Sequence, residues 1–196
     1  MRIALITIPR SGSSFLSRQL AKKHKVNHVG ELFHEKALTH KMGYDFPLTI
    51  DDSLRIWGKG NCIAKIFTRD FIHMPKAKLS LKEYEELVYG TADKIYYLYR
   101  KNTLEHLKSM ITADFTDMYS PYKEFKEVHV DVTQQQIEDQ LKRIDIDVQR
   151  LNDLQGRYNG ETIYFEDFAT DQLKYRYESK FFCNGKELPH NLGLFV

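Results

Sequence analysis

Four short runs of apolar, β-branched or aromatic residues predict the strands of a buried sheet. The first run, residues 2–8 (RIALITI), is mostly apolar and ends at Pro9. Such a run is typical of a strand covered on both faces, as in the centre of a parallel sheet. The other three runs have the same character: residues 62–67, 94–99 and 162–165.

Helical patterns lie between these runs. Ser80 with Glu83 and Thr133 with Gln136 have the spacing of capping boxes, in which side chains satisfy the first free N–H groups of a helix. After Thr133, apolar residues recur every three or four positions up to residue 154, so one face of that helix is expected to pack in the core. The predicted helices are residues 13–25, 80–90, 102–112 and 133–156.

Strands that alternate with helices predict an α/β domain with a mainly parallel sheet flanked by helices. The length of 196 residues suits one domain, and the sequence has no internal repeat or low-complexity linker. We therefore expect a single domain over residues 1–196. Residues 40–60 and 113–130 have the least regular patterns and could form lids over a site.

Composition narrows the class of protein and of partner. The chain is 42% hydrophobic and 29% charged, which is ordinary for a soluble globular protein. Its formal net charge of +2 gives no general reason to expect nucleic acid or an anionic membrane as a partner, so an anion site must come from local placement. Cys62 and Cys183 lack metal-ligand spacing and are expected to be free thiols. The apolar start of the chain is too short for a signal peptide or a membrane span, so we expect a cytoplasmic protein without a transmembrane segment.

The loop after the first predicted strand is the strongest candidate for chemistry. A helix that follows a strand presents free N–H groups and the positive end of its dipole, so a phosphate or sulfate there meets several donors at once. A glycine lets the backbone approach the anion, while hydroxyls and a guanidinium add donors and charge. The alternative is a serine-capped helix beside a solvent-exposed arginine. The predicted anion-binding residues are Pro9, Arg10, Ser11, Gly12, Ser13 and Ser14.

This loop is not a Walker A motif. Gly12 is followed by Ser13 and Ser14, where the pattern GxxxxGKS/T requires a lysine. No loop lysine is therefore available to reach a γ-phosphate, which argues against an ordinary ATPase or kinase.

Two segments resemble motifs of the sulfotransferases. The segment ITIPRSGSSFLSRQL is similar to the family's 5′-phosphosulfate loop, in which a strand is followed by proline, a basic residue, serine, glycine and two hydroxyl residues. The segment YYLYRKNTLEHLKSM is similar to its 3′-phosphate motif, with Arg100 at a strand end and Ser109 nine positions later. Within the family, the chain looks closest to the small bacterial and viral carbohydrate or lipid sulfotransferases.

The resemblance implies a three-layer, P-loop NTPase-like fold and a transfer reaction that needs no metal. The donor would be 3′-phosphoadenosine 5′-phosphosulfate (PAPS), and the product nucleotide 3′-phosphoadenosine 5′-phosphate. The sulfuryl group would pass to a hydroxyl or amine of a small-molecule, carbohydrate or lipid acceptor. Enzymes of this family often close the cofactor site with a basic C-terminal segment, whereas residues 181–196 here offer Lys186 and His190.

The resemblance also implies catalytic roles. Arg10 would stabilise charge on the leaving phosphate, and Glu31 would be the general base. Lys65 would contact the sulfonate or the leaving group, although it could equally be an outward charge at a strand end. Competing bases are histidines, because an unperturbed imidazole titrates near neutrality: His28, His34 and His40.

Near the last predicted strand, residues 164–168 (YFEDF) resemble a late strand end of the same family. Glu166 and Asp167 follow that strand, and we expect them to cap the next helix.

Three classes of function stay open. The first is a sulfotransferase, and the second is a nucleotide-binding or phosphoryl-transfer enzyme of the wider P-loop group. The third is a non-catalytic nucleotide-binding relative, which the weakly basic tail favours.

Overall fold

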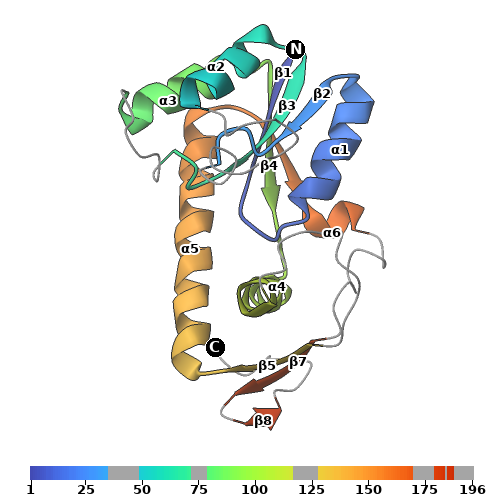
Figure 1. Ribbon diagram of the computed structural model, residues 1–196, viewed down its shortest axis with the longest axis vertical. Coiled ribbons are helices and arrows are strands. Elements are labelled where there is room, and N and C mark those ends of the chain that lie inside the picture. Colours follow the sequence, from blue (N-terminus) through green and yellow to red (C-terminus); the bar gives the residue numbers. More distant parts are fainter. Residues whose placement is uncertain (35–48, 72–78, 117–127, 170–178, 184, 188–196) are drawn as a thin grey trace. The chain divides into compact units, whose positions relative to one another are not determined.

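The computed structural model describes residues 1–34, 49–71, 79–116, 128–169, 179–183 and 185–187 (Figure 1). The chain divides into two compact units. The first unit comprises Met1–Tyr99 and Asp147–Tyr164, and the second comprises Arg100–Ile146 and Phe165–Val196. The expectation of a single domain stays a prediction.

The first unit is built on a five-stranded sheet whose paired strands all run parallel. The sequence predicts four of these strands, and the structure adds β2, a short and largely polar strand at one edge. The central strand β1 has every residue after Arg2 buried, as its apolar run predicts. In spatial order the strands are β2 (Asn27–Gly30), β3 (Cys62–Phe67), β1 (Arg2–Thr7), β4 (Lys94–Tyr99) and β6 (Glu161–Tyr164).

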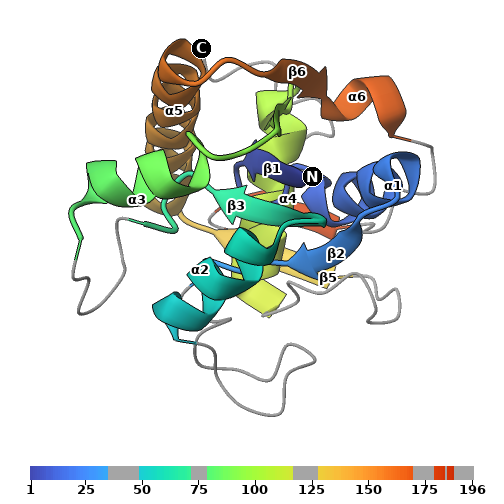
Figure 2. The same ribbon diagram turned by 90° about the horizontal axis from the view of Figure 1, so that it is seen from above.

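Helices cover both faces of this sheet. The helix α1 (Ser13–His24) packs on one face, where it contacts β1, β2 and β3. The other face carries the hydrophobic core, in which Ala4, Ala64 and Tyr97 of the sheet pack with residues of three helices. Both views show α1 on the opposite side of the strands from α2 and α3 (Figures 1 and 2). The three helices of the core face are α2 (Ile50–Lys59), α3 (Leu81–Val88) and the C-terminal part of α5 (Gln134–Arg157).

Side chains cap the starts of these three helices. The predicted capping boxes are confirmed for α3, by Ser80 with Glu83, and for α5, by Thr133 with Gln136. The expectation that residues 40–60 are irregular is wrong for residues 50–59, which form α2. Thr49 and Asp52 provide its capping box, a signal that the sequence contained. Residues 35–48 lie outside the described residues, so a lid there stays a prediction.

The second unit contains α4 (Thr103–Thr116), α6 (Phe165–Phe168) and a small second sheet. In that sheet β5 (Val128–Val132) pairs parallel with β7 (Ser179–Cys183), and β7 pairs antiparallel with β8 (Lys186–Glu187). This sheet was not predicted, whereas α6 is the helix expected after the last strand of the main sheet. The expectation of irregular structure at residues 113–130 is wrong at both ends, which belong to α4 and β5, and residues 117–127 lie outside the described residues.

In the part of the chain that the structure describes, no helix has both the length and the apolar character needed to cross a membrane.

Candidate anion-binding site

The predicted anion loop connects the carboxyl end of β1 to the start of α1. Two of its residues have left-handed backbone conformations: Arg10 has a φ of 64° and Gly12 a φ of 81°. Gly12 is the N-cap of α1, and no side-chain hydrogen bond caps this helix in the described chain. By contrast, α2, α3 and α5 each start with a capping box. The start of α1 is therefore the kind of helix end that can accept an anion.

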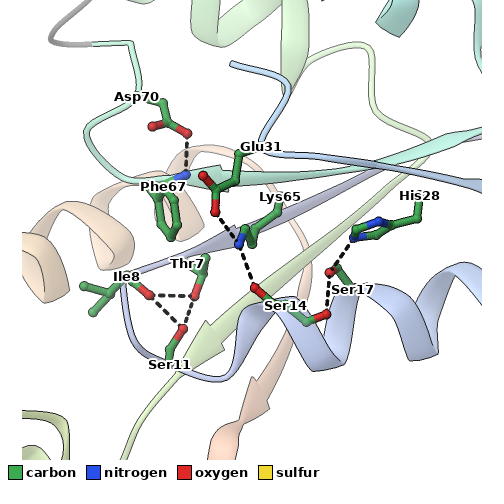
Figure 3. Close-up of polar contacts among 10 residues, drawn as sticks. All are labelled: Thr7, Ile8, Ser11, Ser14, Ser17, His28, Glu31, Lys65, Phe67 and Asp70. Carbon is green, nitrogen blue, oxygen red and sulfur yellow. Dashed lines mark hydrogen bonds and ion pairs between the residues drawn. The ribbon is translucent and has the colours of Figure 1, made fainter. Parts of the chain in front are cut away.

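Hydrogen bonds beneath the loop fix its shape (Figure 3). The Ser11 hydroxyl donates to the carbonyl of Ile8 at 2.7 Å and lies 2.5 Å from the Thr7 hydroxyl. Ser11 and Thr7 are fully buried. The side chain of Ser11 therefore supports the loop from below, and any contact of this residue with an anion would have to come from its backbone.

Lys65 brings a positive charge to this loop from the neighbouring strand. It lies opposite Leu5 in the register of β1 and β3, in the alternating set of residues that faces α1. Its ammonium donates to the Ser14 hydroxyl at 2.9 Å, and only 7% of its side chain is exposed. The interpretation of Lys65 as an outward charge at a strand end is therefore wrong.

Glu31 is the second partner of this ammonium. It directly follows β2, and its carboxylate oxygen Oε1 lies 2.5 Å from Nζ of Lys65 (Figure 3). Because β1, β2 and β3 are parallel, their carboxyl ends meet at one edge of the sheet, the usual place for ligands in open α/β folds. The structure thus brings Ser14 and Glu31 to Lys65. In the sequence, Ser14 is 51 residues and Glu31 is 34 residues from Lys65.

A second cationic side chain at this edge, Arg69, pairs with helix α5. Arg69, two residues after β3, contacts the buried Asp147 of α5 through its Nε at 2.6 Å. The Thr68 hydroxyl donates to the same carboxylate oxygen at 2.9 Å. These contacts join the end of β3 to α5.

The competing histidines lie in different surroundings. His28 of β2 bonds through Nε2 to the Ser17 hydroxyl of α1 at 2.9 Å. Burial lowers the pKa of His28, and the charges of Arg18 and Lys65 lower it further. The ring of His34 meets the ring of Phe67 edge-on, with 5.5 Å between the centroids. His40 lies outside the described residues.

The predicted 3′-phosphate residues belong to the second unit. Arg100 directly follows β4 in the chain, and its guanidinium lies over the ring of Phe165 at 4.6 Å. Ser109 lies within α4 and is partly buried. The structure therefore keeps the strand-to-helix order that the motif requires, while the roles of both residues stay predictions.

Glu166 departs from its predicted role. The expectation that it precedes and caps the next helix is wrong, because Glu166 lies inside α6. Its carboxylate accepts hydrogen bonds from the backbone N–H groups of Lys101 and Asn102, each at 3.0 Å, at the start of α4. Burial raises the pKa of the Glu166 carboxyl, but these N–H groups outweigh that effect and hold the pKa below its usual value. Asp167 contacts the ammonium of Lys101 at 3.0 Å.

Comparison with solved structures finds proteins that are similar to this chain in fold. Shikimate kinase from Bacteroides thetaiotaomicron has a similar fold, with a TM-score of 0.51 and 11% identity over 89% of this chain and 91% of that chain. The YorR protein from Bacillus subtilis, solved with phosphorylated GDP, has a TM-score of 0.47 and 15% identity over 89% of this chain and 91% of that chain. A gluconokinase from Sinorhizobium meliloti has a TM-score of 0.40 and 15% identity over 84% of this chain and 82% of that chain. Neither a protein family nor a curated protein matches the sequence.

The similarity to shikimate kinase shows the fold and nothing finer, because the identity is low. The prediction of a three-layer, P-loop NTPase-like α/β fold with a parallel sheet flanked by helices is confirmed. The resemblance to sulfotransferases has no family match to support it.

Proposed function

We propose that residues 9–14 bind the phosphate end of a nucleotide and that the chain transfers a charged group from this nucleotide to an acceptor. The observation that supports this most is the buried ammonium of Lys65, which bonds both Ser14 of the loop and Glu31. A buried charge is costly unless it is paired, and here it is paired where an anion would meet the start of α1.

The first candidate reaction is sulfuryl transfer from PAPS, which the sequence of the loop favours. The acceptor oxygen attacks sulfur and forms a new S–O bond, while the bond from sulfur to the 5′-phosphate oxygen breaks. The leaving 3′-phosphoadenosine 5′-phosphate takes the electron pair of that bond, and the acceptor proton passes to Glu31. Arg10, Ser14 and Lys65 stabilise the negative charge that develops on the sulfonate and the leaving oxygen.

In this proposal the two ends of the nucleotide have separate contacts. The 5′ end lies on the backbone and side chains of residues 9–14. Arg100 and Ser109 bind the 3′-phosphate, as the motif around them implies. A small-molecule, glycan or lipid hydroxyl, or an amine, is the acceptor.

The second candidate is phosphoryl transfer, which the similarity in fold to shikimate kinase favours. In that case the donor is a nucleoside triphosphate. Lys65 then supplies, from β3, the lysine ammonium that the loop lacks because Ser13 follows Gly12. The chemistry at the start of α1 is similar in both candidates, so the identity of the nucleotide separates them.

Thermal unfolding with ligands decides between these candidates. A ligand present at 100 times its dissociation constant stabilises a protein by about 2.7 kcal/mol. If the donor is PAPS, 3′-phosphoadenosine 5′-phosphate should raise the melting temperature far more than ATP with magnesium does. The opposite order would favour phosphoryl transfer, and no shift with either ligand would reject the proposed nucleotide site.

Transfer itself is measured with sulfur-labelled PAPS and a panel of sugars, phenols, lipids and amines. Glu31→Gln should slow transfer while the bisphosphate still binds, because the amide cannot accept the acceptor proton. Glu105→Gln is the matched control, since Glu105 is also a carboxylate paired with a lysine, Lys108 at 3.1 Å. Binding of the bisphosphate without transfer to any acceptor would indicate the non-catalytic relative.

A further inference from the structure

Ser17 and His28 form a contact beside the anion loop that the proposed function does not use. The Ser17 hydroxyl lies 3.2 Å from the carbonyl of Ser14, one turn earlier in α1, and 2.9 Å from Nε2 of His28. Ser17 is fully buried. Ser14 is thus held at two points, through its carbonyl by Ser17 and through its hydroxyl by Lys65 (Figure 3).

The number of protons fixes the direction of these bonds. A serine hydroxyl has one hydrogen, and donating it to the Ser14 carbonyl leaves the oxygen as an acceptor for His28. His28 must then donate from Nε2, which selects the imidazole tautomer with its hydrogen on that nitrogen. Since Nε2 already donates to Ser17, it is not available to accept a proton from an acceptor hydroxyl.

We infer that Ser17 and His28 are positioning residues of the anion loop: His28 orients the Ser17 hydroxyl, and Ser17 holds the Ser14 carbonyl. This inference rests on the proposed function, because it matters only if Ser14 and Lys65 meet an anion. The first turn of α1 is thereby fixed so that the Ser14 hydroxyl stays on the ammonium of Lys65. Without this contact, the donors at the start of α1 have more freedom, and ordering them on binding would weaken the affinity.

The same helix provides a matched control at its other end. His24, the last residue of α1, bonds through Nε2 to the Tyr96 hydroxyl at 2.8 Å. This is also a histidine-to-hydroxyl bond between α1 and the sheet, but it lies at the opposite end of the helix from Gly12. If such bonds only stabilise the fold, variants of His24 and of His28 should therefore change nucleotide binding to the same extent.

The test measures the dissociation constant of 3′-phosphoadenosine 5′-phosphate and the melting temperature of the free protein. The variants are Ser17→Ala, His28→Leu, His28→Gln and His24→Leu. Ser17→Ala and His28→Leu should each weaken binding about tenfold, which is the loss of about one hydrogen bond. His28→Gln should restore binding to within about twofold, because its amide N–H can donate to Ser17. His24→Leu should lower the melting temperature and leave the dissociation constant unchanged.

The inference is overturned if Ser17→Ala and His28→Leu bind the bisphosphate as tightly as the natural protein does. It is equally overturned if His24→Leu weakens binding by the same factor, since the effect would then be general to α1. If His28→Leu does not fold, Ser17→Ala decides the matter, because alanine is smaller and favours a helix. If the natural protein binds neither the bisphosphate nor ATP, the proposed function fails and this inference fails with it.

Discussion

The helices α1 and α4 both begin just after a buried strand of the parallel sheet, but their first turns are satisfied in different ways. At α1, the N-cap is Gly12, no side chain caps the helix in the described chain, and the nearby charge is the ammonium of Lys65. At α4, the Asn102 side chain accepts from the N–H of Glu105, and Glu166 accepts from the two N–H groups before the helix.

The difference shows that a strand followed by a helix is not enough to make an anion site. The donors of a helix end are available to a ligand only where no side chain of the protein already uses them. At α4 a carboxylate already accepts from two N–H groups at the start of the helix, so an anion there would depend on side chains such as the guanidinium of Arg100. At α1 the nearby charged group is instead the ammonium of Lys65, which donates to the Ser14 hydroxyl. A positive charge at this end of the helix favours binding of an anion.

The largest expected effect is at α1. Lys65→Met removes the charge between Ser14 and Glu31 and leaves that carboxylate beside the proposed anion. Hydrogen bonds to charged groups contribute about 1.5–3 kcal/mol, so the bisphosphate should bind about 10- to 100-fold more weakly. Isothermal titration calorimetry measures this. The control is Lys101→Met, which removes an exposed lysine paired with Asp167; equal losses in both variants would contradict the assignment to α1.

Gly12→Ala tests the N-terminus of α1, where Gly12 is the N-cap. A left-handed conformation costs a residue with a Cβ about 1–2 kcal/mol, so chemical denaturation should show a loss of stability of this size. The added methyl group also lies where the backbone would approach the anion, and binding should weaken. Gly60→Ala is the matched control, since Gly60 also has a positive φ, 71°, and an added Cβ there meets its nearest atoms at 4.0 Å. Since its ψ of −167° differs from that of Gly12, its stability cost need not be equal, but nucleotide binding should not change.

Arg100→Ala tests whether the side chain of Arg100, between β4 and α4, contacts the anion. The bisphosphate should bind about tenfold more weakly, while a ligand without the 3′-phosphate should be affected little. Arg55→Ala is the control, because Arg55 is exposed and pairs with Asp52 in another helix. An equal loss with both ligands would show that Arg100 does not recognise the 3′-phosphate.

The smallest expected effect concerns the carboxylate at α4. Glu166→Gln should cost about 1 kcal/mol at neutral pH, the usual size for a helix cap. Because the pKa of Glu166 is lowered by folding, this stabilisation is present above its usual value of 4.5 and is lost as the pH falls through the folded value. The difference between the variant and the natural protein should therefore vanish in acid. Asp167→Asn, which breaks an exposed ion pair, should change stability little at any pH.

Local patterns were sufficient for most of the first unit and for the start of α5 in the second. The apolar runs at β1, β3 and β4 and the capping boxes of α3 and α5 each depend on residues close in sequence, and the structure contains all of them. The polar strand β2 was missed because its four residues have no alternation to detect. The strands β5 and β7 were missed because they pair with each other although they are far apart in the sequence. The strand β8 pairs with the neighbouring β7 but has only two residues, too few to show a pattern.

In the anion loop, too, some features followed from local sequence and others did not. Its sequence alone indicated a candidate site, because a glycine and hydroxyl residues after a buried strand have a local physical meaning. Ser17 was not found in this way: its spacing from Ser14 shows only that the two are neighbours on a helix, and nothing local links it to His28. Likewise, the sequence could not show that the Ser11 hydroxyl is turned into the protein.

The sequence by itself determined four strands of the main sheet, the helices with local signals, and where an anion could meet the chain. Only the tertiary structure decided which charges serve that place. The register of β1 and β3 brings Lys65 to Ser14, parallel pairing brings Glu31 to the same edge, and Glu166 closes the start of α4. These contacts join residues far apart in the chain, and their energy depends on burial and distance, which no local pattern of residues contains.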